Sequence, residues 1–256
     1  MEYLIFLKLK SDEVAIKGRG CADVRKQGDW LSKEDTSSQT VSTEGLMLSC
    51  MIDTIEGREV ASTNILGAIL QTDYYKGDIY IKLEGDMVIL LEEIDLEYYK
   101  YFIYTEYYLR KCMYAESKKA IYGTLEVSLL FWGKLSKSLE EMRYQRNEYD
   151  WCVMKKIVDN KQCTILWHVD DLKTSQFNPA IISSVFADID AEYLKVAKMT
   201  ITRGKVNKYL GMTIDYSLTD KLILSISDYI VKCLKISQNT QRGNQPHLLQ
   251  TTSLTL

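Results

Sequence analysis

The sequence predicts an α+β fold, in which antiparallel strands and helices alternate along the chain, and three observations support this. Of the 256 residues, 46% are hydrophobic and 26% are charged, a balance typical of a globular protein that buries a core. Apolar residues recur every three or four positions from Leu125 to Met142, which predicts one long amphipathic helix. Two apolar segments flank a turn at Asp159-Asn160-Lys161, which predicts a β-hairpin.

The N-terminal quarter predicts a strand, a loop, a helix and a buried strand. Residues 3–9 are predicted as the first strand. The glycine-rich basic stretch from Lys17 to Gln27 favours a solvated turn, and contact with phosphate is the alternative. Thr43 to Ile55 has helical apolar spacing with Ser42 or Thr43 as its N-cap. Val60 to Leu70 indicates a buried strand that runs into a turn or the start of a helix.

The middle of the chain predicts a strand and a helix, followed by a tyrosine-rich segment. Ile79 to Leu83 alternates apolar and polar residues, as a strand does, and Met87 to Ile94 is predicted to be helical. The segment from Tyr98 to Tyr114 contains seven tyrosines. This density is explained by a half-buried sheet face, which we favour, or by a platform on which bases stack.

The second half of the chain is predicted to place two adjacent carboxylates at a tight turn. Trp151 to Met154 and Cys163 to Val169 form the predicted hairpin, and Leu172 to Ser175 is a return strand. Asp170 and Asp171 therefore fall at the tip of a second turn. Further on, the patterns indicate a helix, two strands, a helix and a frayed tail: 179–194, 209–216, 222–226, a helix starting at 227, and the residues after 238.

Charge and cysteine usage exclude several classes of protein. The net charge is −3, from 32 basic and 35 acidic residues, so any nucleic-acid site must be a local patch. The six cysteines form no CxxC pair and only two histidines are present, which argues against zinc and a disulfide framework and favours a cytoplasmic or nuclear location. We expect no signal peptide and no membrane contact, because no apolar stretch approaches the roughly 20 residues of a transmembrane helix.

The neighbourhood of the acidic pair carries a family resemblance. An Asp-Asp dipeptide alone is typical of a surface turn, although paired carboxylates are also the ligands that Mg²⁺ prefers. The segment His168-Val169-Asp170-Asp171 resembles the Tyr-x-Asp-Asp box of reverse transcriptases, in the Val-Asp-Asp form of copia-type retrotransposon polymerases. Four further segments resemble other boxes of this family in the same order: 64–70 with 79–81, 118–123, 209–214 and 224–230.

The resemblance implies a right-hand polymerase fold, with an antiparallel palm sheet flanked by helices. It places a fingers-like region at 1–60, a palm at 61–216 with a fingers insertion near 85–115, and a truncated thumb with a frayed tail at 217–256. It implies RNA-directed DNA polymerase activity with an RNA template, a DNA primer and dNTPs as partners. The cofactor would be Mg²⁺ or Mn²⁺, as two ions in an active enzyme.

The same resemblance assigns roles to individual residues. Asp170 and Asp171 correspond to catalytic metal ligands, and Asn64 stands at the position of the first catalytic aspartate. The positions implied to bind the nucleotide are Lys17, Arg19, Ile69 and Tyr122. The segment implied to grip the primer is Tyr209, Leu210 and Gly211.

Departures from the family pattern predict that catalysis is severely impaired. Asn64 is a neutral amide where the family has an aspartate, and it is a poorer ligand for Mg²⁺. Ile69 replaces an aromatic residue, and the basic run expected after Gly123 is absent. Asp73 is a conceivable substitute ligand, but on the family's geometry it lies too far from Asn64.

Other functional hypotheses remain open at this stage. One is a module without catalysis in which the basic stretch and the tyrosines still bind nucleic acid. Another is the product of a decayed element without a selected function, because we expect an isolated piece of a longer polyprotein. A nucleotide cyclase with a similar palm is disfavoured, since it would not explain the boxes at 118–123 and 209–214. The oligomeric state and template preference are not predicted.

Overall fold

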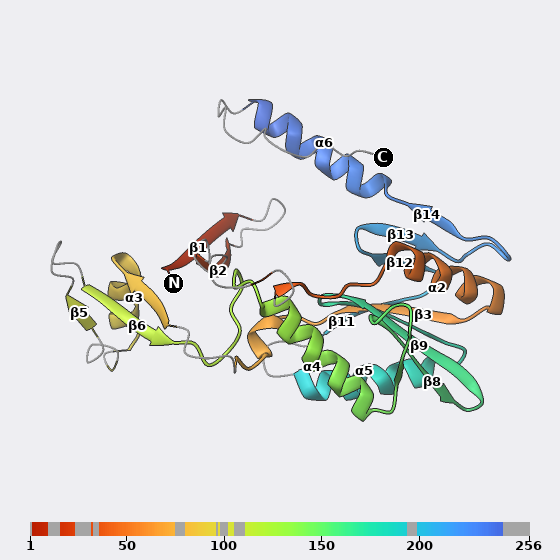
Figure 1. Ribbon diagram of the computed structural model, residues 1–256. Coiled ribbons are helices and arrows are strands. Elements are labelled where there is room, and N and C mark those ends of the chain that lie inside the picture. Colours follow the sequence, from red (N-terminus) through yellow and green to blue (C-terminus); the bar gives the residue numbers. More distant parts are fainter. Residues whose placement is uncertain are drawn as a thin grey trace.

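The computed structural model contains three β-sheets with helices packed against them (Figure 1). The structure describes residues 2–9, 16–23, 32, 36–74, 80–95, 97, 102–104, 111–193 and 199–242. Within these ranges, helices separate groups of strands that pair mostly antiparallel, with β1 and β4 paired in parallel, which confirms the mixed α and β composition expected from the sequence. No helix in these ranges has both the length and the apolar composition needed to cross a bilayer.

The central sheet has six strands, and every neighbouring pair in it is antiparallel. Two hairpins form its middle, because β8 and β9 are joined at Asp159-Asn160, and β9 and β10 are joined at Val169-Asp170. The predicted turn at Asp159-Asn160 is therefore confirmed, whereas the second turn comes one residue earlier than predicted, at Val169-Asp170, with Asp171 already on the following strand. In spatial order the strands are β11 (Thr200–Arg203), β3 (Glu59–Asn64), β10 (Asp171–Gln176), β9 (Lys161–His168), β8 (Val153–Val158) and β7 (Gln145–Arg146).

Three helices enclose this sheet. In Figure 1, α2 (Thr43–Glu56) lies on one side of the sheet, and α4 (Val127–Glu141) and α5 (Pro179–Tyr193) lie on the other. The ring of Phe131 on α4 packs edge-on against Tyr193 on α5, with 6.0 Å between their centroids. The fully buried side chains of β9, Ile165 and Trp167 among them, join the same apolar core.

Helix α2 has the boundaries that its sequence predicts. The Ser42 side chain accepts a hydrogen bond from the Gly45 N–H at 3.0 Å, as an N-cap does. Asp150 fixes this cap, because its Oδ2 accepts from both the N–H and the hydroxyl of Ser42. The helix ends at Gly57, whose φ of 65° suits a residue without a Cβ.

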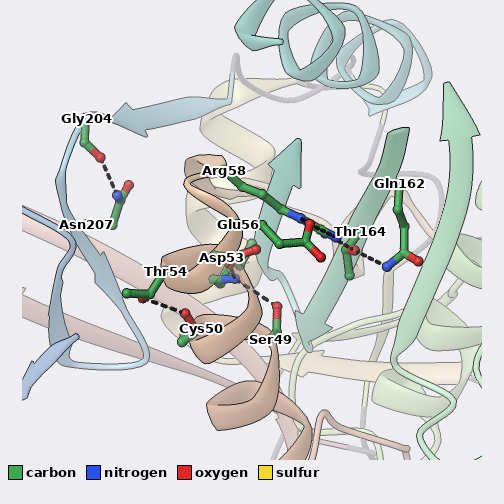
Figure 2. Close-up of polar contacts among 11 residues, drawn as sticks. Ser49, Cys50, Asp53, Thr54, Glu56, Arg58, Gln162, Thr164, Gly204 and Asn207 are labelled. Carbon is green, nitrogen blue, oxygen red and sulfur yellow. Dashed lines mark hydrogen bonds and ion pairs between the residues drawn. The ribbon is translucent and has the colours of Figure 1, made fainter. Parts of the chain in front are cut away.

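A buried ion pair attaches α2 to the central sheet. Lys173 on β10 donates to Asp53 and, at 3.0 Å, to Ser49 Oγ, and the Lys173 and Asp53 side chains are each 1% exposed. Next to it, Arg58 donates to Thr164 of β9 at 3.0 Å and pairs with Glu56 (Figure 2). Helix α2 therefore holds β10, and Arg58, just after the helix, holds β9; these two strands meet at the acidic turn.

A second sheet contains the N-terminal strands and the segment inserted after η2 (Ile69–Gln71). Helix α3 (Asp86–Ile94) follows β4, as the sequence predicts. The strand order is β2 (Ile16–Asp23), β1 (Glu2–Leu9), β4 (Tyr80–Glu84), β6 (Lys111–Glu116) and β5 (Phe102–Tyr104). Tyr104 and Tyr114 lie on β5 and β6, and the other tyrosines of the 98–114 segment lie outside the described residues.

The expectation of a turn in the basic N-terminal stretch is wrong for its first part. Residues 16–23 form strand β2, which pairs antiparallel with β1 along eight residue pairs, including Ile5 with Gly20 and Leu7 with Gly18. Glycine is a poor strand former in isolation, so pairing with an apolar neighbour strand overrides its local preference. Residues 24–27 lie outside the described part of the chain.

The second sheet contacts the loop before α4 at a glycine. The Ala22 N–H on β2 donates to the Tyr122 carbonyl at 2.7 Å. Gly123 has a φ of 97°, and a Cβ there would lie 2.4 Å from the Ala22 carbonyl oxygen. Backbone atoms cannot move aside as a flexible side chain can, so this close approach requires glycine.

Gly123→Ala is expected to lower the free energy of unfolding by about 1–3 kcal/mol, because the new methyl group collides with backbone at a positive φ. The matched control is Gly133→Ala, at a helical site where an added Cβ meets no atom within 4 Å. That change should stabilise the protein by about 0.5–1 kcal/mol. Chemical denaturation measures both values, and equal effects of the two variants would contradict the proposed close contact.

Two boundary predictions in the C-terminal part are wrong. The segment 209–216 is two strands, β12 (Val206–Tyr209) and β13 (Met212–Asp215), joined by Leu210 and Gly211 with φ values of 50° and 77°. Two successive residues at positive φ form a tight turn, which the apolar Leu210 conceals in the sequence. Helix α6 (Ser227–Arg242), which follows β14 (Ile223–Ser225), continues beyond residue 238, where fraying was expected.

The long amphipathic helix predicted from Leu125 to Met142 is confirmed as α4. Its buried apolar residues are Val127, Phe131, Leu135 and Leu139, spaced four apart, and Trp132 packs against the same core. Leu125 precedes the helix and is 36% exposed, so the start of the predicted apolar stretch does not enter the core.

Candidate functional site

The candidate site lies where β3 ends and the turn between β9 and β10 begins. Asn64 is the last residue of β3, and Asp171 is the first residue of β10. These two residues are direct partners in the antiparallel register of β3 and β10. The structure therefore brings together Asn64 and the acidic pair, which are separated by more than one hundred positions in the sequence.

The turn that carries the acidic pair has an unusual backbone. Val169 has a φ of 55°, a conformation that β-branched residues rarely adopt. Such residues store about 1–3 kcal/mol of strain, which the surrounding ladder must offset. The ladder does so on both sides, because His168 pairs with Asp171 and the Ile65 N–H donates to the Asp170 carbonyl at 2.9 Å.

The Asn64 side chain contacts the second carboxylate of the acidic pair. Its Nδ2 donates to Asp171 Oδ1 at 2.9 Å. The same amide acts to lower the pKa of the neighbouring Asp170 carboxyl, because it favours the charged form. Asn64 therefore presents an N–H, and not an oxygen, to Asp171.

Asp170 is held in an environment that disfavours its charge. Partial burial raises the pKa of its carboxyl above the usual 3.8, and the negative charge of Asp171 acts in the same direction. Hydrogen bonds from its own backbone and from Asn64, together with His168, act in the opposite direction and are outweighed. A perturbed carboxyl at a strained turn is typical of a functional site.

Asp170→Asn is expected to stabilise the protein at pH 7, raising the melting temperature by about 2–4 °C for a gain near 1 kcal/mol. A raised folded-state pKa means that stability falls as pH rises through that pKa, so the gain shrinks as the pH is lowered towards 3.8. Thermal melts of both proteins between pH 4 and pH 7 measure it. Asp188→Asn on α5, an exposed position, should stay within about 0.5 kcal/mol of wild type. A lower melting temperature for Asp170→Asn at pH 7 would contradict this electrostatic picture.

The segment expected to grip the primer contacts the acidic pair through Tyr209. The buried Tyr209 hydroxyl donates to the Asp171 carbonyl at 3.3 Å. Burial, together with the Asp171 charge, raises the pKa of this hydroxyl far above its usual value, which keeps it a donor. Leu210 and Gly211 form the turn between β12 and β13. Gripping a primer stays a prediction.

The residues expected to bind the nucleotide are spread over other elements. Lys17 and Arg19 lie on β2, and their side chains are outside the described part of the structure. Ile69 is 8% exposed and packs with Ala120 and Val127. Tyr122 contacts β2 through its carbonyl group. Their role in nucleotide binding stays a prediction.

Asp73, the conceivable substitute metal ligand, lies in the loop before β4. It forms an isolated β-bridge with Lys119, and the two side chains form an ion pair. The Asp73 carboxylate is therefore paired with a cationic side chain.

The donor set does not fit two divalent ions. Mg²⁺ and Mn²⁺ bind oxygen ligands, whereas Asn64 presents an N–H to Asp171. Among the residues that the structure describes, no group of three or more His, Cys, Asp or Glu side chains could hold a metal. The arrangement is that of an amide hydrogen-bonded to one of two adjacent carboxylates.

One polar feature near the site was missed by sequence reasoning. The ion pair between Lys173 and Asp53 supports β10 two residues after Asp171. A signal was present, since Lys173 is a charged residue within a strand whose neighbours Leu172 and Thr174 are fully buried. A lysine there requires a buried partner, but the sequence alone does not identify that partner.

The chain matches no protein-family model. It is 28% identical over 140 residues to the putative transposon Ty5-1 protein of Saccharomyces cerevisiae, and this match covers 52% of the chain and 44% of that protein. The chain is therefore related in sequence to a transposon protein, of which the match spans less than half.

Two telomerase structures are similar to this chain at low TM-scores. The apo telomerase of Candida tropicalis, truncated from its C-terminal domain, has a TM-score of 0.43 and 10% identity, covering 88% of this chain and 55% of that one. The telomerase of Candida albicans, in complex with a fragment of telomeric RNA, has a TM-score of 0.39 and 10% identity, covering 84% and 41%.

Proposed function

We propose that this chain is the reverse-transcriptase-like domain of a copia-type retrotransposon polyprotein, and that its catalysis is impaired. The observation that carries the proposal is the register of β3 and β10, which pairs Asn64 with Asp171. The two boxes that resemble the first motif and the Val-Asp-Asp motif of such polymerases thus meet at one end of two neighbouring strands in an antiparallel sheet. The sequence match to a transposon protein supports the same origin.

The site chemistry explains the impairment. Template-directed nucleotidyl transfer needs carboxylates arranged to stabilise both the attacking and the leaving oxygen. Here one of the three implied carboxylates is an amide, and that amide is hydrogen-bonded to Asp171. Each 1.4 kcal/mol of lost transition-state stabilisation slows a reaction about tenfold. The partners of the domain would be an RNA template, a DNA primer and dNTPs.

Primer extension on an RNA template tests the proposal. With Mg²⁺ or Mn²⁺ and dNTPs, the wild-type chain should bind a labelled primer–template hybrid at low salt, and this binding should weaken as the salt concentration rises. Primer extension should stay at the background rate. Efficient extension that is abolished in Asp170→Ala would contradict the impairment. Failure to bind the hybrid even at low salt would contradict the polymerase-like role.

A further inference from the structure

We propose that the Asn64 amide takes the place of a divalent ion beside Asp171, so that the acidic pair does not fit a bound metal. This inference rests on the proposed function and deepens it. Asn64 Nδ2 donates to Asp171 Oδ1 at 2.9 Å, and the register of β3 and β10 holds the two residues opposite each other. A cation bound at the Asp171 carboxylate would occupy the same position. The amide N–H groups supply the partial positive charge that such a cation would otherwise supply.

The hydrogen bond makes metal binding unfavourable in two ways. The Asp171 Oδ1 lone pair that accepts from Asn64 Nδ2 at 2.9 Å is no longer available to a metal ion. The amide nitrogen itself is a donor and not a ligand. If the Asn64 side chain rotated to present its oxygen, an ion would gain one neutral ligand in place of a carboxylate.

The rest of the described site supports a state that needs no cation. The Tyr209 hydroxyl and the Ile65 N–H donate to the backbone carbonyls of Asp171 and Asp170. His168 adds a favourable interaction with the Asp170 carboxylate. The strained turn at Val169 and the residue after it are therefore held by hydrogen bonds from Ile65, which follows β3, and from Tyr209 on β12, and neither contact depends on an ion.

Metal binding to the purified chain tests this inference with a readout other than activity. Binding of MnCl₂ is followed by the electron paramagnetic resonance signal of free Mn²⁺, and melting temperatures are measured in EDTA and in MnCl₂. For the wild type we expect the same melting temperature in both and no saturable Mn²⁺ binding at the dyad of Asp170 and Asp171. Asn64→Asp should melt lower than wild type in EDTA, because three carboxylates then face one another. It should recover in MnCl₂ and bind Mn²⁺ at least tenfold more tightly.

Two further variants keep the test decisive. Asp171→Asn in the wild-type background should leave Mn²⁺ binding unchanged, and this comparison holds even if Asn64→Asp does not fold. Asn64→Asp combined with Asp170→Asn should lose the gained binding. Saturable Mn²⁺ binding by the wild type that disappears in Asp171→Asn would overturn the inference.

The outcomes also separate this inference from the proposed function. If the wild type binds Mn²⁺ at the dyad but extends no primer, the inference fails and the impaired polymerase stands. If the wild type does not bind Mn²⁺, and neither the wild type nor any variant binds a primer–template hybrid, the inference stands and the polymerase-like role fails.

Discussion

Lys173→Met lowers the free energy of unfolding by about 3–5 kcal/mol, the largest loss of stability expected from any single change near the site. Lys173 and Asp53 are each 1% exposed, so removing the ammonium group leaves a buried carboxylate without its partner. One oxygen of that carboxylate, Oδ1, already lacks a hydrogen-bond partner within the described residues. Urea denaturation of both proteins measures the difference.

Two controls separate the loss of the charge pair from the loss of packing. The double change Lys173→Met with Asp53→Leu removes both charges and should recover most of the stability. Lys137→Met removes a lysine whose partner Glu141 lies 3.9 Å away, with both side chains mostly exposed, and should change stability by at most about 1 kcal/mol. A loss below about 1 kcal/mol for Lys173→Met would contradict the structural role of this pair.

Asn64→Asp should raise the rate of primer extension by about 10²- to 10⁴-fold over wild type in Mn²⁺. The expected gain follows from restoring a carboxylate worth several kcal/mol in the transition state, at about tenfold for each 1.4 kcal/mol. The change is local, because residue 64 already lies opposite Asp171 in the ladder. Single-turnover extension of a labelled primer on an RNA template measures the rates.

Matched variants decide whether the new carboxylate is responsible. Asn64→Gln keeps the amide and should stay at background. Asn64→Asp combined with Asp170→Asn should return to background, because it removes a second carboxylate. Extension that remains at background in Asn64→Asp, while that variant binds Mn²⁺ and the hybrid, would show that further changes in this chain block catalysis.

The parts of the fold that could be predicted are those encoded over short distances in the sequence. Alternation of apolar residues and the Asp159-Asn160 turn were sufficient to predict the hairpin of β8 and β9. The N-cap at Ser42 and the glycine at residue 57 mark both ends of α2. Turn chemistry likewise predicted that Asp170 and Asp171 follow an apolar strand.

The parts that could not be predicted depend on contacts between distant segments. Strand β2 contains two glycines and forms because β1 lies beside it. The turn at Leu210 and Gly211 is recognised only from its positive φ values. The direction of the Asn64 amide depends on the register of β3 and β10, and no local pattern gives this register. The sequence identified Asn64 as a weak metal ligand, and the structure shows it as a hydrogen-bond donor to the dyad.

The central claim is that the Asn64 amide is hydrogen-bonded to Asp171 where β3 ends and β10 begins, in place of a metal ion, and a crystal structure of the wild-type chain grown in millimolar MnCl₂ tests it most directly. We expect Asn64 Nδ2 within hydrogen-bond distance of Asp171 Oδ1, near the 2.9 Å found here, and no anomalous manganese peak between Asp170 and Asp171. A manganese ion bound between the two carboxylates, or Asn64 and Asp171 on opposite faces of the sheet, would contradict it.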